Sequence, residues 1–354
     1  MSSQSQSATT LLTQVRGLLT VDVDSMDPDV AARHGGGTFR KFCDMTSNQA
    51  IVHGQAVLPA RRNLLQAAVE SVVAKKTHQL EKGNAEFEQD VVDVLTVLLA
   101  KAVYPHLTGN VHAQTSPSAA YDTKKTVEHA RKLIALFAEH GIPATRVCIK
   151  IPATPESLLA CRELEAGGIQ TLATCMFSLP QALAASQAGC TYVAPYFNEL
   201  RVHFQPGLWV EYADPKTEHP MSTVILSIVH AFRKLGSRTL VMPASIVTPQ
   251  EVIALVSLSP DHLTLSGGVL DALAALPTLA LEPFSSPPDP ALPPSLNGID
   301  YLANDGALLR EALAADAEVQ RRLLDALRIF GEKEMETREV LRGFVGSESG
   351  QLES

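Results

Sequence analysis

The chain has few of the features that mark nucleic-acid-binding, membrane-spanning or disulfide-stabilised proteins. Its 29 lysine and arginine residues are outnumbered by 38 aspartate and glutamate residues, which gives a formal net charge of −9. An acidic balance of this size argues against nucleic acid or an anionic membrane as a partner. No run of about 18 apolar residues occurs, so we expect no transmembrane helix. No long apolar segment follows the polar N-terminus as it does in a signal peptide.

Cysteine, histidine and glycine motifs with redox, metal or nucleotide spacing are also missing. None of the five cysteines belongs to a C-x-x-C pair, and most lie in apolar runs: Cys43, Cys148, Cys161, Cys175 and Cys190. Reduced thiols of this kind are typical of a cytoplasmic protein. His203 and His219 have no metal-ligating partners at a useful spacing, and Gly35-Gly36-Gly37 opens no G-x-G-x-x-G helix. We therefore expect neither a metal nor an organic cofactor.

What the chain does contain is an alternation of short apolar runs with longer segments of helical period. Eight runs have the composition of strands, at residues 18–24, 41–46, 110–114, 147–152, 170–174, 192–195, 239–243 and 262–265. Helices are expected at residues 61–81, 87–103, 122–140, 156–166, 179–188, 217–235, 249–256 and 268–275. Alternating strands and helices predict a parallel sheet, and continuous apolar runs predict strands that are covered on both faces. Eight such units predict a (β/α)₈ TIM barrel with an extra helical segment at its C-terminus.

We expect one barrel domain with extensions at both ends. Residues 1–15 are expected to form a flexible tail and residues 16–281 the barrel. Residues 282–344 contain a proline-rich connection followed by a helix that packs back on the barrel. Residues 345–354 are polar and are expected to form a second flexible tail.

Polar residues stand at or just beyond the carboxyl ends of most of the expected strands. In a (β/α)₈ barrel the catalytic groups lie at this end, so side chains from successive strands converge. The rule selects Asp24, Asn48, Gln114, Lys150, Thr174, Tyr196 and Ser245.

Lys150 is the most informative of these residues, because it lies in the apolar run Val147-Cys148-Ile149-Lys150-Ile151-Pro152. Burial disfavours the ammonium form and lowers the pKa of a lysine. A neutral amine can attack a ketone, and the resulting iminium withdraws electrons so that a neighbouring carbon–carbon bond can break. Taken alone, such a lysine more often extends to the surface or pairs with a carboxylate.

The other selected residues also have ordinary structural roles open to them. Asp24 is suited to act as a general base or to hold a substrate hydroxyl, but an aspartate there can equally cap a turn. Asn48 alone favours a helix cap. Gln114 and Thr174 could satisfy backbone groups, and Tyr196 could serve in packing.

The same residues, taken in order, resemble the transaldolase family. The resemblance rests on Lys150-Ile151-Pro152-Ala153-Thr154, Leu164-Glu165, Gly168-Ile169, Thr174, Phe177-Ser178, Gln181-Ala182 and Ala194-Pro195-Tyr196, which run over about fifty residues without a gap. Upstream, Asp24-Ser25-Met26-Asp27 and Asp44-Met45-Thr46-Ser47-Asn48 resemble two further motifs of the family, with Gln49 in place of a proline. The resemblance covers roughly residues 16–343.

The resemblance implies a class I aldolase with Lys150 as its Schiff-base lysine. Asp24 would be the acid or base for the substrate hydroxyl, Asn48 would hold substrate hydroxyls and Thr174 would position the catalytic water. Ser245, Arg201 and Thr46 are further candidate substrate-binding residues.

The chain departs from the sugar-phosphate transaldolases at the water site. Gln114 stands where those enzymes have glutamate, Leu172 where they have asparagine and Tyr196 where they have phenylalanine. Gln114, Thr174 and Tyr196 instead resemble the water-holding trio of the fructose-6-phosphate aldolase branch. Glutamine cannot exchange protons as a carboxylate does, so Tyr196 becomes the better acid or base.

The phosphate site of the family is altered as well. Glu199 and Val247 stand where the family has arginines, and Arg201 could only partly substitute. We therefore expect a small carbonyl or sugar substrate without phosphate. Two other points stay open: the chain could be a catalytically retired barrel that binds a ligand or partner, and its apolar helical faces could support either a monomer or a homodimer.

Overall fold

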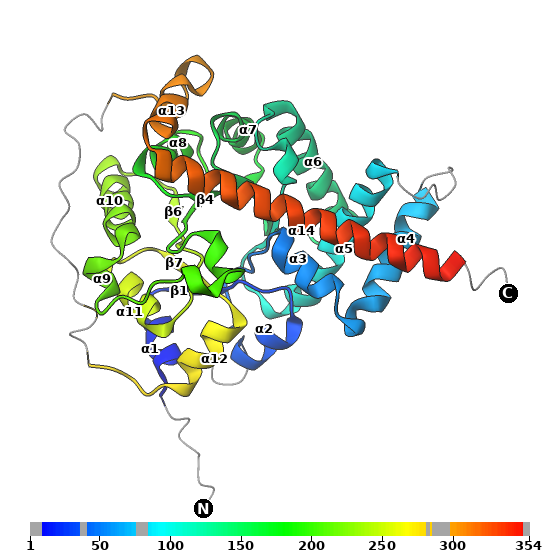
Figure 1. The fold of residues 1–354 in the computed structure, drawn as a ribbon, viewed down its shortest axis with the longest axis horizontal. Helices are drawn as coiled ribbons and strands as arrows, with labels where there is room; N and C mark the ends of the chain where they lie inside the picture. The colour runs from blue at the N-terminus through cyan, green and yellow to red at the C-terminus, as the bar shows by residue number, and fades with distance from the viewer. Residues whose placement is uncertain (1–8, 36–40, 76–83, 281–283, 285–297, 350–354) are drawn as a thin grey trace, which may run out of the picture.

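The computed structural model describes residues 9–35, 41–75, 84–280, 284 and 298–349. Parallel strands surround the centre of the molecule and helices cover them (Figure 1). The strands are β1 Thr20–Val23, β2 Val111–Gln114, β3 Val147–Pro152, β4 Gln170–Met176, β5 Tyr192–Pro195, β6 Leu240–Val241 and β7 His262–Leu265. β1 pairs with β7, and β2 to β6 pair in order along the chain.

Residues 41–46 occupy the eighth strand position, although they form only isolated bridges. Met45 bridges to Val23 on one side and to Val111 on the other, both in parallel. Between β6 and β7, the amide of Asp261 donates to the carbonyl of Val241 at 3.1 Å. The ring is therefore closed, and the predicted (β/α)₈ barrel is confirmed.

The composition of the strands explains their burial on both faces. All six residues of β3 are buried, as are all four of β2, β5 and β7. The expected outer helices are present as α4 Arg62–Lys75, α5 Ala85–Val103, α6 Thr123–Glu139, α7 Pro155–Ala166, α8 Leu179–Gln187, α10 Pro220–Leu235, α11 Pro249–Ser257 and α12 Gly267–Ala275. Several begin at a side-chain cap that ends the loop after a strand: Thr154, Ser178, Thr248 and Ser266.

Short helices that the sequence did not predict complete the barrel unit. These are α1 Leu11–Leu18, α2 Pro28–Gly35, α3 Gln49–Ala56, α9 Pro215–Glu218 and α13 Ala303–Ala315. The predicted tail at residues 1–15 is therefore too long, because α1 begins at Leu11. Thr10 caps this helix, and Leu11, Leu12 and Val15 are buried on the barrel side. Residues 1–8 lie outside the described part of the chain.

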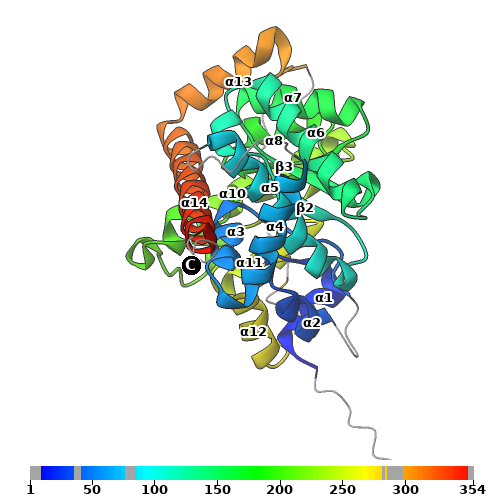
Figure 2. The same cartoon turned by 90° about the vertical axis from the view of Figure 1, so that its right-hand side faces the viewer.

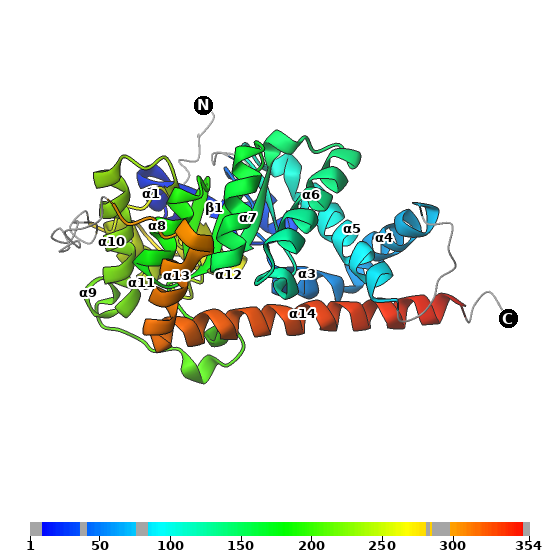
Figure 3. The same cartoon turned by 90° about the horizontal axis from the view of Figure 1, so that it is seen from above.

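The long C-terminal helix α14, Ala317–Ser349, crosses the end of the barrel at which the strands terminate. It packs against α3, the turn Leu200–His203 after β5 and the turn Pro117–Ala119 after β2. Figures 2 and 3 show α14 beside α3, along one side of the barrel. The helix also includes residues 345–349, so the predicted C-terminal tail begins too early. Most of the proline-rich connection lies outside the described residues.

None of the described helices is both long enough and apolar enough to cross a membrane.

Candidate active site

Lys150 lies at the base of a cavity at the carboxyl ends of the strands. Its side chain belongs to β3 and only 2% of its surface is exposed. The cavity has a volume of about 230 Å³ and is lined by Asp24, Asn48, Ala50, Ile51, Lys150, Tyr196, Leu200, His203, Phe204, Ala244, Ser245, Ile246, Thr264 and Ser266. The structure thus brings five of the predicted residues to one cavity: Lys150, Asp24, Asn48, Tyr196 and Ser245.

Burial lowers the pKa of Lys150 below its ordinary value. Asp24, Cys175 and Cys148 act in the opposite direction, but the loss of solvent is the larger effect. The Nζ atom lies 6.0 Å from the centre of the Tyr196 ring. The amine is therefore shifted towards its neutral, nucleophilic form and faces the cavity.

Asp24 is oriented by two buried hydroxyls behind it. The Thr46 hydroxyl donates to Oδ1 of Asp24 at 2.6 Å, and the Thr264 hydroxyl lies 2.5 Å from that of Thr46. Since the hydrogen of Thr46 points to Asp24, Thr264 must donate to Thr46. Thr46 is fully buried and does not line the cavity, so its contact is with Asp24 and not with a substrate.

Two members of the predicted water-holding trio, Thr174 and Tyr196, are in contact, and the third, Gln114, lies on β2. Thr174 donates to the hydroxyl of Tyr196 at 3.2 Å, and Gln114 is the register partner of Lys150 across β2 and β3. Burial raises the pKa of Tyr196 well above its ordinary value, so the phenol keeps its proton. Gln114 and Thr174 do not line the main cavity but are buried beside it.

Asn48 caps a helix and also lies at the cavity. Its side-chain oxygen accepts from the amide of Ile51 at 3.0 Å and caps α3. It also lines the cavity.

His203 lines the cavity, although no sequence pattern selected it as a site residue. Its Nε2 atom lies 2.8 Å from the hydroxyl of Ser245, a residue 42 positions away whose backbone has a φ of 60°. Burial lowers the pKa of His203, despite the opposing influence of Asp24 and Glu251. A neutral imidazole and a hydroxyl therefore form one wall of the cavity. The pairing of His203 with Ser245 can be recognised only from the contact between their two loops in the structure.

Arg201 does not line the cavity, contrary to its prediction as a substrate-binding residue. Its guanidinium lies 2.9 Å from Glu199 and 3.3 Å from Asp325 of α14. Glu199 also pairs with Arg321 at 2.6 Å. Carboxylates within the protein thus already occupy the arginine, and Lys150 is the one lysine or arginine among the described residues that line the cavity.

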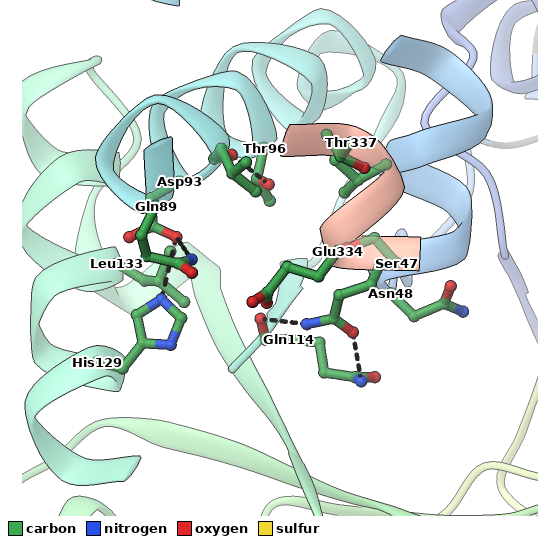
Figure 4. A pocket seen from close by; sticks show the side chains of 13 residues that line it. Ser47, Asn48, Gln89, Asp93, Thr96, Gln114, His129, Leu133, Glu334 and Thr337 are labelled. Carbon is green, nitrogen blue, oxygen red and sulfur yellow. Dashed lines mark hydrogen bonds and ion pairs between the residues drawn. The ribbon is translucent and has the colours of Figure 1, made fainter. Parts of the chain in front are cut away.

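A second and much smaller pocket lies between the barrel and α14 (Figure 4). Its volume of about 20 Å³ has room for about one water molecule. Asn48 and Gln114 line it from the barrel side, and Glu334 and Thr337 line it from α14. Burial raises the pKa of Glu334.

Below the catalytic end, the barrel interior contains a layer of paired aspartates and histidines. Asp22 contacts His262 at 2.7 Å, and Asp44 contacts His112 at 2.8 Å. Asp22 and Asp44 approach Cys43 closely enough to share an ion. Each carboxylate also accepts a backbone amide, which leaves these oxygens engaged within the protein.

Comparison with known proteins now agrees with this geometry. The family described as Transaldolase/Fructose-6-phosphate aldolase matches residues 21–332. The chain belongs to this family. A transaldolase of Saccharomyces cerevisiae is 30% identical over 299 residues, which cover 83% of this chain and 85% of that protein. A transaldolase of Xanthomonas campestris pv. campestris is 30% identical over 325 residues, covering 86% and 96%. One of Alteromonas mediterranea is 29% identical over 267 residues, covering 75% and 79%.

Membership in the transaldolase/fructose-6-phosphate aldolase family makes the chain an enzyme of the transaldolase and class I aldolase type.

Proposed function

We propose that the chain is an aldolase or transaldolase that forms a Schiff base through Lys150 with a ketone substrate lacking phosphate. The observation that carries the proposal is the burial of Lys150 at the base of a cavity lined by Asp24 and Tyr196. A lysine amine made neutral by burial is the nucleophile that imine chemistry requires.

The reaction follows from the positions of these side chains. The Nζ atom of Lys150 adds to the ketone carbon, and the carbinolamine then loses water to give an iminium. Asp24 accepts the proton of the substrate hydroxyl on the carbon beyond the bond that breaks. That bond cleaves, an aldehyde leaves and the electron pair moves into an enamine on Lys150. Protonation and hydrolysis complete an aldol cleavage, whereas addition to an acceptor aldehyde completes a transfer.

The cavity wall supports a neutral substrate. Arg201 is paired with carboxylates, and Glu199 and Val247 supply no cation to a phosphate. Part of the cavity lining is apolar, with Ile51 and Phe204 among its residues. A polar carbonyl end near Lys150 and an uncharged remainder fit this surface better than a dianion does.

Trapping the imine tests the role of Lys150. The protein is incubated with dihydroxyacetone or fructose, reduced with borohydride and weighed by mass spectrometry. We expect a covalent adduct in the wild type and in Lys101→Ala, an exposed lysine on α5, and none in Lys150→Ala. An adduct of unchanged yield in Lys150→Ala would rule out the proposed nucleophile.

A catalytically retired barrel is the second candidate, and the engagement of Arg201 by Glu199 and Asp325 favours it. It predicts ligand binding without an adduct for every ketone donor tested. The intact set of Lys150, Asp24 and Tyr196 around the cavity favours the enzyme.

A further inference from the structure

We propose that Gln49 is a positioning residue that fixes the side-chain amide of Gln114, so that Oε1 of Gln114 is presented beside Lys150 as a hydrogen-bond acceptor. The inference rests on the proposed Schiff-base function and adds to it the direction in which protons move. It depends on a chain of hydrogen bonds that begins at a backbone carbonyl.

The orientation of the Gln49 amide is determined by the main chain. Its Nε2 atom donates to the carbonyl oxygen of Thr115 at 2.9 Å and lies 3.5 Å from that of Gln114. A carbonyl oxygen only accepts hydrogen bonds, so the nitrogen of the amide must be on this side. The Oε1 atom of Gln49 is therefore directed to the other side.

Gln114 takes its orientation from Gln49. The Nε2 atom of Gln114 donates to Oε1 of Gln49 at 2.7 Å. Turning either amide over would bring two donors or two acceptors face to face in a buried place. Gln49 and Gln114 are 8% and 6% exposed, so bulk water does not compete for these groups.

The Oε1 atom of Gln114 is left buried without a hydrogen-bond partner among the described residues. Gln114 and Lys150 are register partners on β2 and β3, so their side chains lie on the same face of the sheet. A buried acceptor without a donor is unfavourable, and a hydroxyl or water next to Lys150 would supply the missing hydrogen.

The orientation of the Gln114 amide determines which residue supplies the proton in the dehydration step. The hydroxyl of the carbinolamine keeps its hydrogen and donates a hydrogen bond to Oε1 of Gln114, an amide that does not exchange protons as a carboxyl does. When the carbon–oxygen bond breaks and the nitrogen lone pair forms the iminium, the departing oxygen needs one further proton to leave as water. Tyr196 supplies that proton and recovers it from the water that later hydrolyses the imine.

The backbone around Gln49 holds the two hydrogen-bonded glutamines in place. Gln49 is the first residue of α3, directly after the cap formed by Asn48. Gln49 also lines the small pocket of Figure 4, together with Gln114 and Glu334. Water therefore does not readily change the orientation of the Gln49 side-chain amide.

The test measures the rate of borohydride-trapped adduct formation in variants of similar side-chain length. Gln49→Met removes the donor and the acceptor, and we expect the rate to fall roughly tenfold, the effect of losing one orienting hydrogen bond. In a Gln114→Met background, Gln49→Met should lower the rate of adduct formation by less than about twofold, because the amide that Gln49 orients is already gone. An equal loss in both backgrounds would mean that Gln49 acts only through general packing and would overturn the inference.

Gln49→Glu supplies a second and independent readout. A protonated carboxyl can donate to Thr115 and accept from Gln114, whereas an ionised one repels the Thr115 carbonyl. We expect its rate, divided by that of the wild type, to approach unity at low pH and to decline as the pH rises. A ratio that is independent of pH contradicts the proposal. Absence of any adduct in the wild type would instead remove the Schiff-base function itself.

Discussion

Lys150 differs from most lysines because its full length lies inside the barrel. The 2% of its surface that is exposed cannot solvate an ammonium group well. Asp24 and the thiols of Cys148 and Cys175 favour the charged form, yet burial dominates and the pKa falls. The reactivity of the amine therefore comes from its strand position more than from any one neighbour.

The lowered pKa of Lys150 predicts the pH dependence of imine formation. Only the neutral amine attacks a carbonyl, and its fraction rises as the pH passes upward through the pKa of the folded protein. We expect the initial rate of borohydride-trapped adduct formation to rise with pH and to level off below pH 10.5, the ordinary pKa of lysine. A rate that is still rising steeply at pH 10.5 would mean that burial does not shift this amine.

The sequence predicted the residues whose position depends on strand ends alone. Lys150, Asp24, Asn48, Tyr196 and Ser245 converge because the carboxyl ends of parallel strands meet at one rim. His203 and Arg201 could not be placed in this way. Their surroundings depend on Ser245, 42 residues from His203, and on Asp325 of the C-terminal helix. Contacts between loops and a distant helix leave no periodic signal in the sequence.

At the scale of elements, continuous apolar runs in the sequence predicted the regular strands well. The irregular segments were predicted less well. Residues 41–46 complete the ring through isolated bridges and not as a regular strand. The helix α1 was missed because it has only eight residues and follows a polar tail. The length of α14 was underestimated because its last turns contain glycine and serine.

A closed set of hydrogen bonds fastens α14 to the barrel near the catalytic end. His129 accepts the amide of Ser116 at Nδ1 and therefore donates from Nε2 to Asp93, as Figure 4 shows for the latter pair. Gln89 donates to Asp93 at 2.8 Å. Ser116 donates to Glu334 at 3.0 Å. Arg338 donates both to Glu334 and to Gln89, which completes the set.

Removing Arg338 should loosen this attachment. The side chains of Arg338 and Glu334 are 13% and 7% exposed, so Arg338→Met leaves a buried carboxylate without its cation. We expect a loss of about 3 kcal/mol in the free energy of unfolding by urea at neutral pH. The loss should shrink at lower pH, because the pKa of Glu334 is already raised by burial and the carboxyl becomes neutral by taking up a proton.

Arg328→Met on the same helix is the matched control. Arg328 pairs with Glu332 four residues away, and both side chains are about half exposed, at 51% and 53%. A pair so exposed contributes less than about 1 kcal/mol. Equal losses in the two variants would show that the buried network does not anchor α14. Lys333 of α14 lies 5.3 Å from the ring of Phe204, which lines the cavity. We therefore also expect loosening of α14 in Arg338→Met to change the turnover rate.

At the scale of the whole molecule, charge and cavity favour the same kind of substrate. The net charge of −9 repels an approaching anion, and Lys150 is the one lysine or arginine lining the described cavity. The carboxylates Glu199 and Asp325 hold the nearby guanidinium of Arg201 in a network that includes α14. Binding of a phosphate by Arg201 would therefore compete with these carboxylates of the barrel and its C-terminal helix.

This arrangement predicts how salt changes the use of two matched donors, fructose and fructose 6-phosphate. Raising the ionic strength from about 0.01 to about 0.15 M shortens the Debye length from about 30 to about 8 Å and screens long-range repulsion. We expect the second-order rate of adduct formation to increase with salt for fructose 6-phosphate and to stay constant for fructose, with fructose the faster donor at low salt. The opposite salt dependence, together with a micromolar KM for the phosphorylated sugar, would require a cationic site. In that case a cation outside the described cavity lining, such as Arg201 in its pair with Glu199, would have to move towards the substrate.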